Sequence, residues 1–164
     1  MSILVSDANI VIDFDVAGLL NTLFLLPDEF VTTNILFHDE LMAQHSDLPS
    51  CGLQVVSLDG DAIKSLEALV SLYPKPSFQD LSALALAKRK AWTLLSGDKH
   101  LRQAAQKEEV LVHGTLWLSR RLVENGVLDV TGAKSAFDTM KDQGRRLPWA
   151  EVDRLIASLT IESV

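Results

Sequence analysis

Short apolar runs alternate with helical segments along most of this chain, and this alternation constrains its fold more than any other feature. Apolar runs that suit buried strands lie at 2–6, 28–33, 53–58, 92–98 and 110–114. Helical periodicity or composition marks the segments 34–44, 61–73, 80–91, 99–108 and 115–126. Continuous apolar strands separated by helices are typical of a parallel sheet covered on both faces. The pattern predicts an α/β fold with three layers, α/β/α, around a mainly parallel central sheet.

The pattern changes after Gly126. Residues 131–159 contain two helical stretches without another strand, separated by the sequence "GRRLP". We therefore predict one domain over residues 1–126, with a C-terminal helical extension over 127–164 that packs on the same core.

Composition narrows the class of protein. Of the 164 residues, 48% are apolar, and no apolar run approaches the roughly 18 residues of a membrane span. The lone Cys51 has no partner for a disulfide within the chain, which fits a reducing compartment. These features predict a soluble, cytoplasmic protein without a signal peptide. The net charge of −7 argues against broad adhesion to nucleic acid, although a site built from carboxylates makes a chain acidic by itself.

Four acidic residues stand where the predicted strands and helices meet. Asp7 follows the first apolar run, Asp98 follows the fourth, Asp80 begins a helix, and Glu40 lies about one turn into the helix after "VTT". In an open α/β sheet, ligands bind beyond the carboxyl ends of the strands, so these four side chains are expected to converge. Taken singly, each has a plainer explanation as a helix cap, a turn residue or a surface residue.

Converged carboxylates repel one another unless a cation lies between them. Oxygen ligands of this kind favour Mg²⁺ or Mn²⁺. Such an ion lowers the pKa of bound water and stabilises the displacement of a phosphodiester. The four acidic residues therefore indicate metal-dependent phosphate chemistry.

The stretches "VSDANIVIDF", "HDEL", "QDLSALALAKRKAWTLLSGDKHLRQAA" and "VLVHGTLWLS" together resemble the PIN-domain family of metal-dependent ribonucleases. The resemblance covers residues 1 to about 126 and implies an endoribonuclease that hydrolyses RNA phosphodiester bonds with Mg²⁺ or Mn²⁺. By this resemblance the catalytic residues are Asp7, Glu40, Asp80 and Asp98, of which Asp7, Asp80 and Asp98 hold the metal. The supporting polar residues it implies are Asn9, Ser96 and Thr115.

The chain departs from the family pattern just after Asp98. Many members carry a further acidic residue there, whereas this chain has Lys99, His100 and Arg102. We therefore expect one well-held ion, with a second weak or recruited by substrate, and consider these three side chains candidates for RNA contact. The long C-terminal extension resembles the VapC-like toxins of prokaryotic type II toxin–antitoxin systems, which implies a cognate antitoxin and a homodimer.

Two other interpretations stay open. One is a non-catalytic PIN-like module that binds RNA or protein. The other starts from "NIVIDFD", which resembles the motif of haloacid-dehalogenase-type phosphatases and would use Asp13 and Asp15. The second fits less well, because Ala17 stands where that motif has a threonine. The preferred interpretation places Asp13 and Asp15 at exposed positions on the helix after Asp7.

Overall fold

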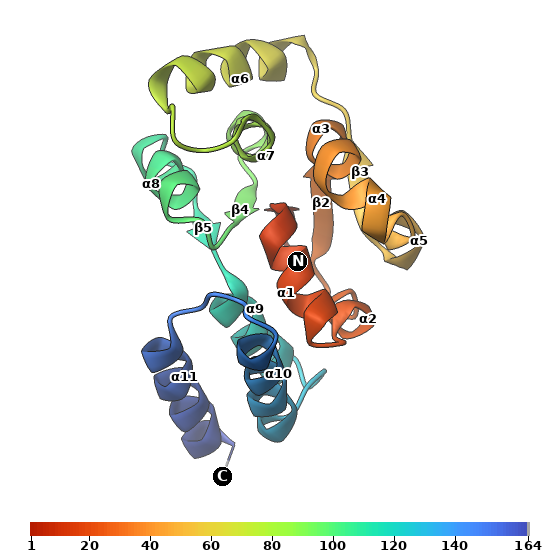
Figure 1. The fold of residues 1–164 in the computed structure, drawn as a ribbon, viewed down its shortest axis with the longest axis vertical. Helices are drawn as coiled ribbons and strands as arrows, with labels where there is room; N and C mark the ends of the chain where they lie inside the picture. The colour runs from red at the N-terminus through yellow and green to blue at the C-terminus, as the bar shows by residue number, and fades with distance from the viewer. Residues whose placement is uncertain (164) are drawn as a thin grey trace.

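The computed structural model describes residues 1–163 and contains a five-stranded, entirely parallel sheet (Figure 1). Its spatial order is β3-β2-β1-β4-β5. The strands are β1 (Ile3–Ser6), β2 (Glu29–Thr33), β3 (Gln54–Val56), β4 (Thr93–Leu95) and β5 (Val112–His113). Every strand lies within an apolar run of the sequence, so the predicted α/β fold is confirmed.

The longer helices occupy the segments between these strands and the C-terminal region. The chain moves from β1 to β2 and β3, then returns to the other side of β1 for β4 and β5. Right-handed crossovers then place the helices before and after this reversal on opposite faces of the sheet. These helices are α1 (Ala8–Val16), α6 (Gly60–Leu72), α7 (Phe78–Lys90), α8 (Lys99–Lys107), α9 (Thr115–Glu124), α10 (Val130–Asp142) and α11 (Trp149–Glu162).

The core lies between the sheet and the helices. Leu4 and Val5 in the central strand β1, and Leu94 and Leu95 in its neighbour β4, are fully buried, as expected for strands covered on both faces. The seven residues 81–87 of α7 are all buried. A helix with no exposed stripe over two turns is an internal element, which explains why its alanine-rich sequence lacks a strong amphipathic pattern.

The predicted helix over 34–44 is interrupted. It consists of α3 (Asn34–Leu36), a π-helical turn η1 (Phe37–Leu41) and α4 (Met42–His45). The prediction of one regular helix was therefore wrong in its middle. A π-helical turn inserts an extra residue into the helical repeat and is frequent at functional sites. Two short helices that the sequence pattern does not predict are α2 (Leu20–Leu23) and α5 (Leu48–Cys51).

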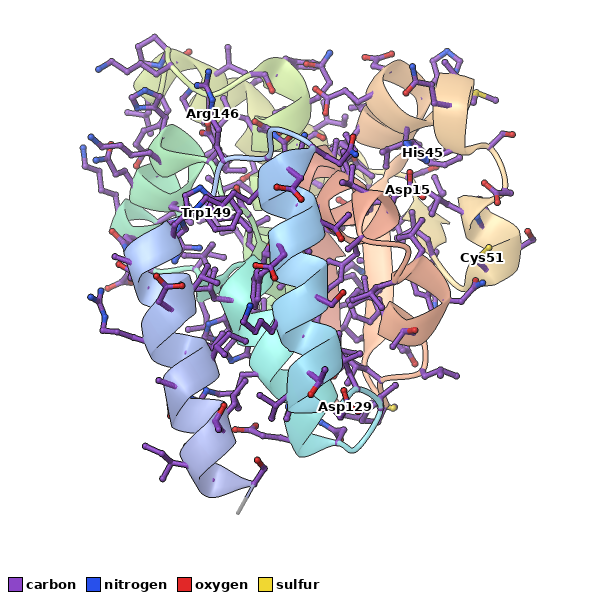
Figure 2. The ribbon with its side chains drawn as sticks, turned by 60° about the horizontal axis from the view of Figure 1, so that its bottom comes forward. Asp15, His45, Cys51, Asp129, Arg146 and Trp149 are labelled. Atoms are coloured by element: carbon purple, nitrogen blue, oxygen red, sulfur yellow. The ribbon has the colours of Figure 1, made fainter. Side chains whose placement is uncertain are left out.

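Helices α10 and α11 lie side by side and pack against α9 (Figures 1 and 2). Phe137, Met140 and Val152 form a second buried apolar cluster between them. The division of the chain at residue 126 stays a prediction, and the last residue of the predicted extension, 164, lies outside the described residues. Among residues 1–163, no helix is both long and apolar enough to span a membrane.

Candidate functional site

Hydrogen bonds hold the carboxyl ends of four neighbouring strands, β2, β1, β4 and β5, together. The backbone N–H of Asp7 donates to the Leu95 carbonyl at 3.0 Å, and the N–H of Ser96 donates to the His113 carbonyl at 2.9 Å. The Thr32 hydroxyl donates to the Ser6 carbonyl at 3.0 Å. These bonds place Asp7 and Ser96 at one edge of the sheet, where the sequence predicted a site.

Asp7 ends β1 and caps helix α1. Its Oδ1 accepts the Ile10 N–H at 2.9 Å, whereas its Oδ2 is buried and has no hydrogen-bond partner among the described residues. The residue is only 1% exposed. Burial raises the pKa of the Asp7 carboxyl to about 7, Asp80 and Asp13 raise it further, and the Ser96 hydroxyl and the Ile10 N–H lower it. A carboxylate oxygen without a partner at such a depth is costly and invites a cation.

Asp98 caps helix α8 in the same manner. Its Oδ2 accepts the Leu101 N–H at 2.8 Å, and its own N–H donates to the Ser96 hydroxyl at 3.0 Å. Ser96 is fully buried. It therefore lies between the two capping carboxylates and restrains the segment that carries Asp98.

Asp80 lies in the first turn of α7, but Ser77 is the residue that caps this helix. The Ser77 hydroxyl accepts the Asp80 N–H at 3.0 Å, so the carboxylate of Asp80 is not used as a cap. Burial raises the pKa of Asp80, the charge of Asp98 raises it further, and the Ser77 hydrogen bond lowers it. The plain explanation of Asp80 as a helix cap is wrong, which leaves its carboxylate available for another role.

Glu40 lies in the π-helical turn η1, at the exposed rim of this edge. Its neighbour Asp39 accepts a hydrogen bond from Gln79 Nε2 at 3.0 Å, which ties the turn to the start of α7. Partial burial raises the pKa of Glu40, and the charges of Asp80 and Asp39 raise it further. The turn therefore holds Glu40 within the electrostatic reach of Asp80.

The four predicted carboxylates thus share one region: the charge of Asp80 raises the pKa values of Asp7 and Glu40, and the charge of Asp98 raises the pKa of Asp80. They are not close enough to form a ready-made cage. Within residues 1–163, no three His, Cys, Asp or Glu side chains are gathered so as to hold a metal ion. The donors still fit Mg²⁺, because this ion keeps several water ligands and takes one or two protein carboxylates together with substrate phosphate. The unpartnered Asp7 Oδ2 is the donor that best fits such an ion.

The predicted supporting residues divide between two places. Ser96 lies with the carboxylates, as described above. Thr115, at the start of α9, is buried and donates to Asp13 Oδ2 at 2.7 Å, while Asn9 Oδ1 accepts from Arg145 Nη2 at 3.2 Å. Asn9 and Thr115 therefore belong to a polar cluster around Asp13 rather than around Asp7.

The prediction that Asp13 is exposed was wrong. It is only 6% exposed and accepts hydrogen bonds from Thr115 and from Arg145 Nε, the latter at 2.7 Å. A signal was present, because Asp13 lies three residues after Ile10 and directly before Phe14, both on the buried side of α1. Asp15 is exposed, as predicted, and its Oδ2 lies 3.7 Å from His45 Nδ1 (Figure 2).

The structure does not place Asp13 and Asp15 as a phosphatase requires. In that arrangement an aspartate nucleophile ends a strand, whereas both residues lie in the second half of helix α1. The arginine and the threonine already occupy both carboxylate oxygens of Asp13. The phosphatase interpretation was therefore wrong.

The three candidate RNA-contacting side chains lie in different places on the surface. Arg102 Nη1 donates to the Ser96 carbonyl at 2.7 Å and lines a pocket with Gly97. His100 lines a separate pocket on the other side of α8, and Lys99 is exposed at the start of that helix. Of these three side chains, Arg102 is the one with a hydrogen bond to the segment that carries Asp98.

Comparisons with known proteins agree with the fold. A family model described as "DUF3368: PIN domain" matches residues 3–160. A solved structure with a similar fold is a PilT N-terminus domain protein from the hyperthermophilic archaeon Sulfolobus solfataricus P2, with 14% identity and a TM-score of 0.52. That similarity covers 74% of this chain and 94% of the archaeal one. No curated protein matches the chain.

Proposed function

Because this chain belongs to the PIN domain family, a nuclease-type fold, we propose that it is a metal-dependent endoribonuclease that hydrolyses RNA phosphodiester bonds. The observation that carries the proposal is the buried Oδ2 of Asp7, which has no hydrogen-bond partner among residues 1–163 and lies in one region with three more carboxylates. The backbone fixes two of these carboxylates as helix caps, so their positions are set before any ligand binds.

Asp7, Asp80 and Asp98 would hold Mg²⁺ or Mn²⁺, directly or through water. The ion, when bound, would lower the pKa of a water molecule and neutralise charge on the phosphate. Glu40, which is exposed at the rim of this site, is suited to orient the attacking water. Its raised pKa makes the carboxylate a better proton acceptor than an ordinary glutamate.

The test is cleavage of RNA by the purified protein with Mn²⁺ and with EDTA, comparing wild type with Asp7→Asn and Asp98→Asn. An asparagine Oδ1 can still accept the capping N–H, so these variants are expected to fold. Each should lower cleavage by at least about 100-fold. Asp15→Asn is the matched control, since Asp15 is an exposed aspartate on the helix that Asp7 caps. This variant should leave cleavage unchanged.

Wild type that is folded, binds RNA and cleaves none with Mn²⁺ would contradict the nuclease proposal and favour the non-catalytic binding module. Cleavage that survives both Asp7→Asn and Asp98→Asn would place the activity at another site.

We also propose that the chain is the toxin of a type II toxin–antitoxin pair in the cytoplasm. It would form a homodimer and be neutralised by a cognate antitoxin. The support is the resemblance of its sequence to VapC-like toxins. Induced expression of the wild type should arrest bacterial growth, whereas Asp7→Asn should not. Growth unaffected by wild type that is expressed and folded would contradict the toxin role. Light scattering on the purified protein would test the dimer.

A further inference from the structure

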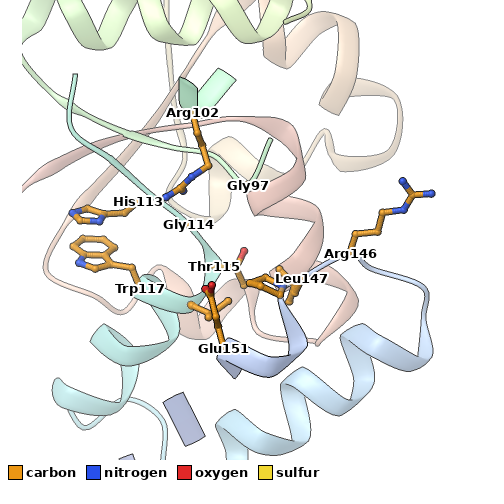
Figure 3. Close-up of a pocket in the computed structure, with 11 residues that line it drawn as sticks. Gly97, Arg102, His113, Gly114, Thr115, Trp117, Arg146, Leu147 and Glu151 are labelled. Carbon is orange, nitrogen blue, oxygen red and sulfur yellow. The ribbon is translucent and has the colours of Figure 1, made fainter. Parts of the chain in front are cut away.

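A pocket of about 470 Å³ adjoins the end of the sheet that carries Asp7 and Asp98, called the carboxylate edge below (Figure 3). It lies between the end of β5, the start of α9 and the loop that leads into α11. One wall is Gly97, the residue between Ser96 and Asp98. A molecule in this pocket therefore lies directly beside the segment that carries one of the four carboxylates.

Two arginines line the pocket of this acidic chain. Arg102 uses one N–H of its guanidinium on the Ser96 carbonyl, which fixes the group at the wall of the pocket while leaving other N–H donors. Arg146 is exposed on the opposite side, and within residues 1–163 it has neither an ion pair nor a hydrogen bond (Figure 3). Glu151 is the carboxylate among the lining residues, so positive charge exceeds negative charge here.

An aromatic pair forms another wall. The rings of His113 and Trp117 stack with centroids 4.1 Å apart and an interplanar angle of 4° (Figure 3). Arg121 covers Trp117 at 5.2 Å from its centroid, so the indole is held in place. Burial and the neighbouring Arg102 lower the pKa of His113, which favours the neutral imidazole.

We propose that this pocket is a subsite for one nucleotide of a single RNA strand. This nucleotide lies next to the phosphate that would be cleaved at the carboxylate edge. Arg102 and Arg146, from opposite sides of the pocket, bind the phosphates on either side of this nucleotide, and the His113 ring contacts its base through the face turned away from Trp117. Guanidinium groups and aromatic rings are the donors and surfaces that proteins use for the phosphates and bases of single strands. The volume falls in the range of small-ligand pockets. The inference rests on the proposed nuclease function. It explains how negatively charged RNA stays bound beside a group of negatively charged carboxylates.

The test measures binding rather than cleavage. A fluorescein-labelled, twelve-nucleotide single-stranded RNA is titrated with the full chain carrying Asp98→Asn, in Mg²⁺, at several salt concentrations. Adding Arg146→Ala should weaken binding about fivefold for every RNA sequence and reduce the salt slope by about one. Arg146→Lys should recover part of the affinity. Adding His113→Leu, which replaces the aromatic ring with an uncharged aliphatic side chain, should weaken binding about fivefold or more without changing the salt slope.

Lys64→Ala is the matched control, because Lys64 is an exposed cation on α6 outside the pocket. Folded pocket variants that bind as the control does would overturn the subsite, and so would a complete lack of RNA binding by the Asp98→Asn chain. Normal cleavage by wild type with unaffected binding by the pocket variants would overturn only the subsite. Loss of binding by the pocket variants, with no cleavage by wild type, would overturn only the nuclease function.

Discussion

Arg145 and Asp13 join the C-terminal region to the first helix, with Arg145 Nε donating to Asp13 Oδ1 at 2.7 Å across 132 positions of sequence. Arg145 lies in the loop between α10 and α11, and the pair is largely shielded from water. The Thr115 hydroxyl donates to the other carboxylate oxygen. Because Asp7 caps the same helix, this ion pair braces the element that begins at the candidate site.

We predict that Arg145→Ala lowers the free energy of unfolding by about 2–3 kcal/mol, because it leaves the Asp13 carboxylate buried without its cation. Urea unfolding measures this difference. The adjacent Arg146→Ala is the control, since Arg146 is exposed and forms no ion pair within residues 1–163, and it should change stability by less than about 0.5 kcal/mol. Equal losses in the two variants would show that the pair contributes nothing specific.

A second pair of neighbouring arginines gives a separate prediction. Arg121 donates through Nε and Nη2 to Asp28, whose side chain is fully buried and also accepts the Ser2 N–H. Arg121→Ala should cost about 3 kcal/mol of unfolding free energy. Arg121→Lys should recover only part, because an ammonium cannot replace the two-pronged contact.

Arg120 is the control for this measurement, since its ion pairs within residues 1–163 are with the exposed Glu124 and Glu162. Arg120→Ala should cost at most about 1 kcal/mol. A loss at Arg120 as large as that at Arg121 would contradict the argument from burial.

The sheet was predictable because its strands are continuous apolar runs and its longer helices carry periodic apolar residues. The π-helical turn at 37–41 was not, because no residue type marks an inserted residue in a helical repeat. The positions of Asp7 and Asp98 at strand ends followed from the pattern. The burial of Asp13 depended on Arg145 and Thr115, which lie more than a hundred residues away and left no local signal of the pairing.

Asp7 should make stability depend on pH. Its pKa is about 7 in the folded chain and 3.8 ordinarily, so the folded chain binds more protons than the unfolded chain between these values. The contribution of Asp7 to the free energy of unfolding therefore decreases as pH rises from about 4 to about 7 and is constant above that. In EDTA at pH 8, Asp7→Asn should be more stable than wild type, by up to about 4 kcal/mol, and the gain should shrink toward pH 4. Asp15→Asn should show no such trend in urea unfolding, and a gain for Asp7→Asn that does not vary with pH would contradict this cause.

Divalent ions should stabilise the wild type through the same carboxylate. Mn²⁺ at about 100 times its dissociation constant adds about 2.7 kcal/mol to the free energy of unfolding, which corresponds to roughly 5–10 °C in Tm for a chain of this size. The ion binds the deprotonated carboxylate, so the rise in Tm should be larger at pH 8 than at pH 6, and EDTA should reverse it. Asp7→Asn should lose most of the rise, whereas Asp15→Asn should keep all of it. A rise in Tm that is the same in Asp7→Asn and wild type would place the ion away from Asp7 and contradict the proposed metal site.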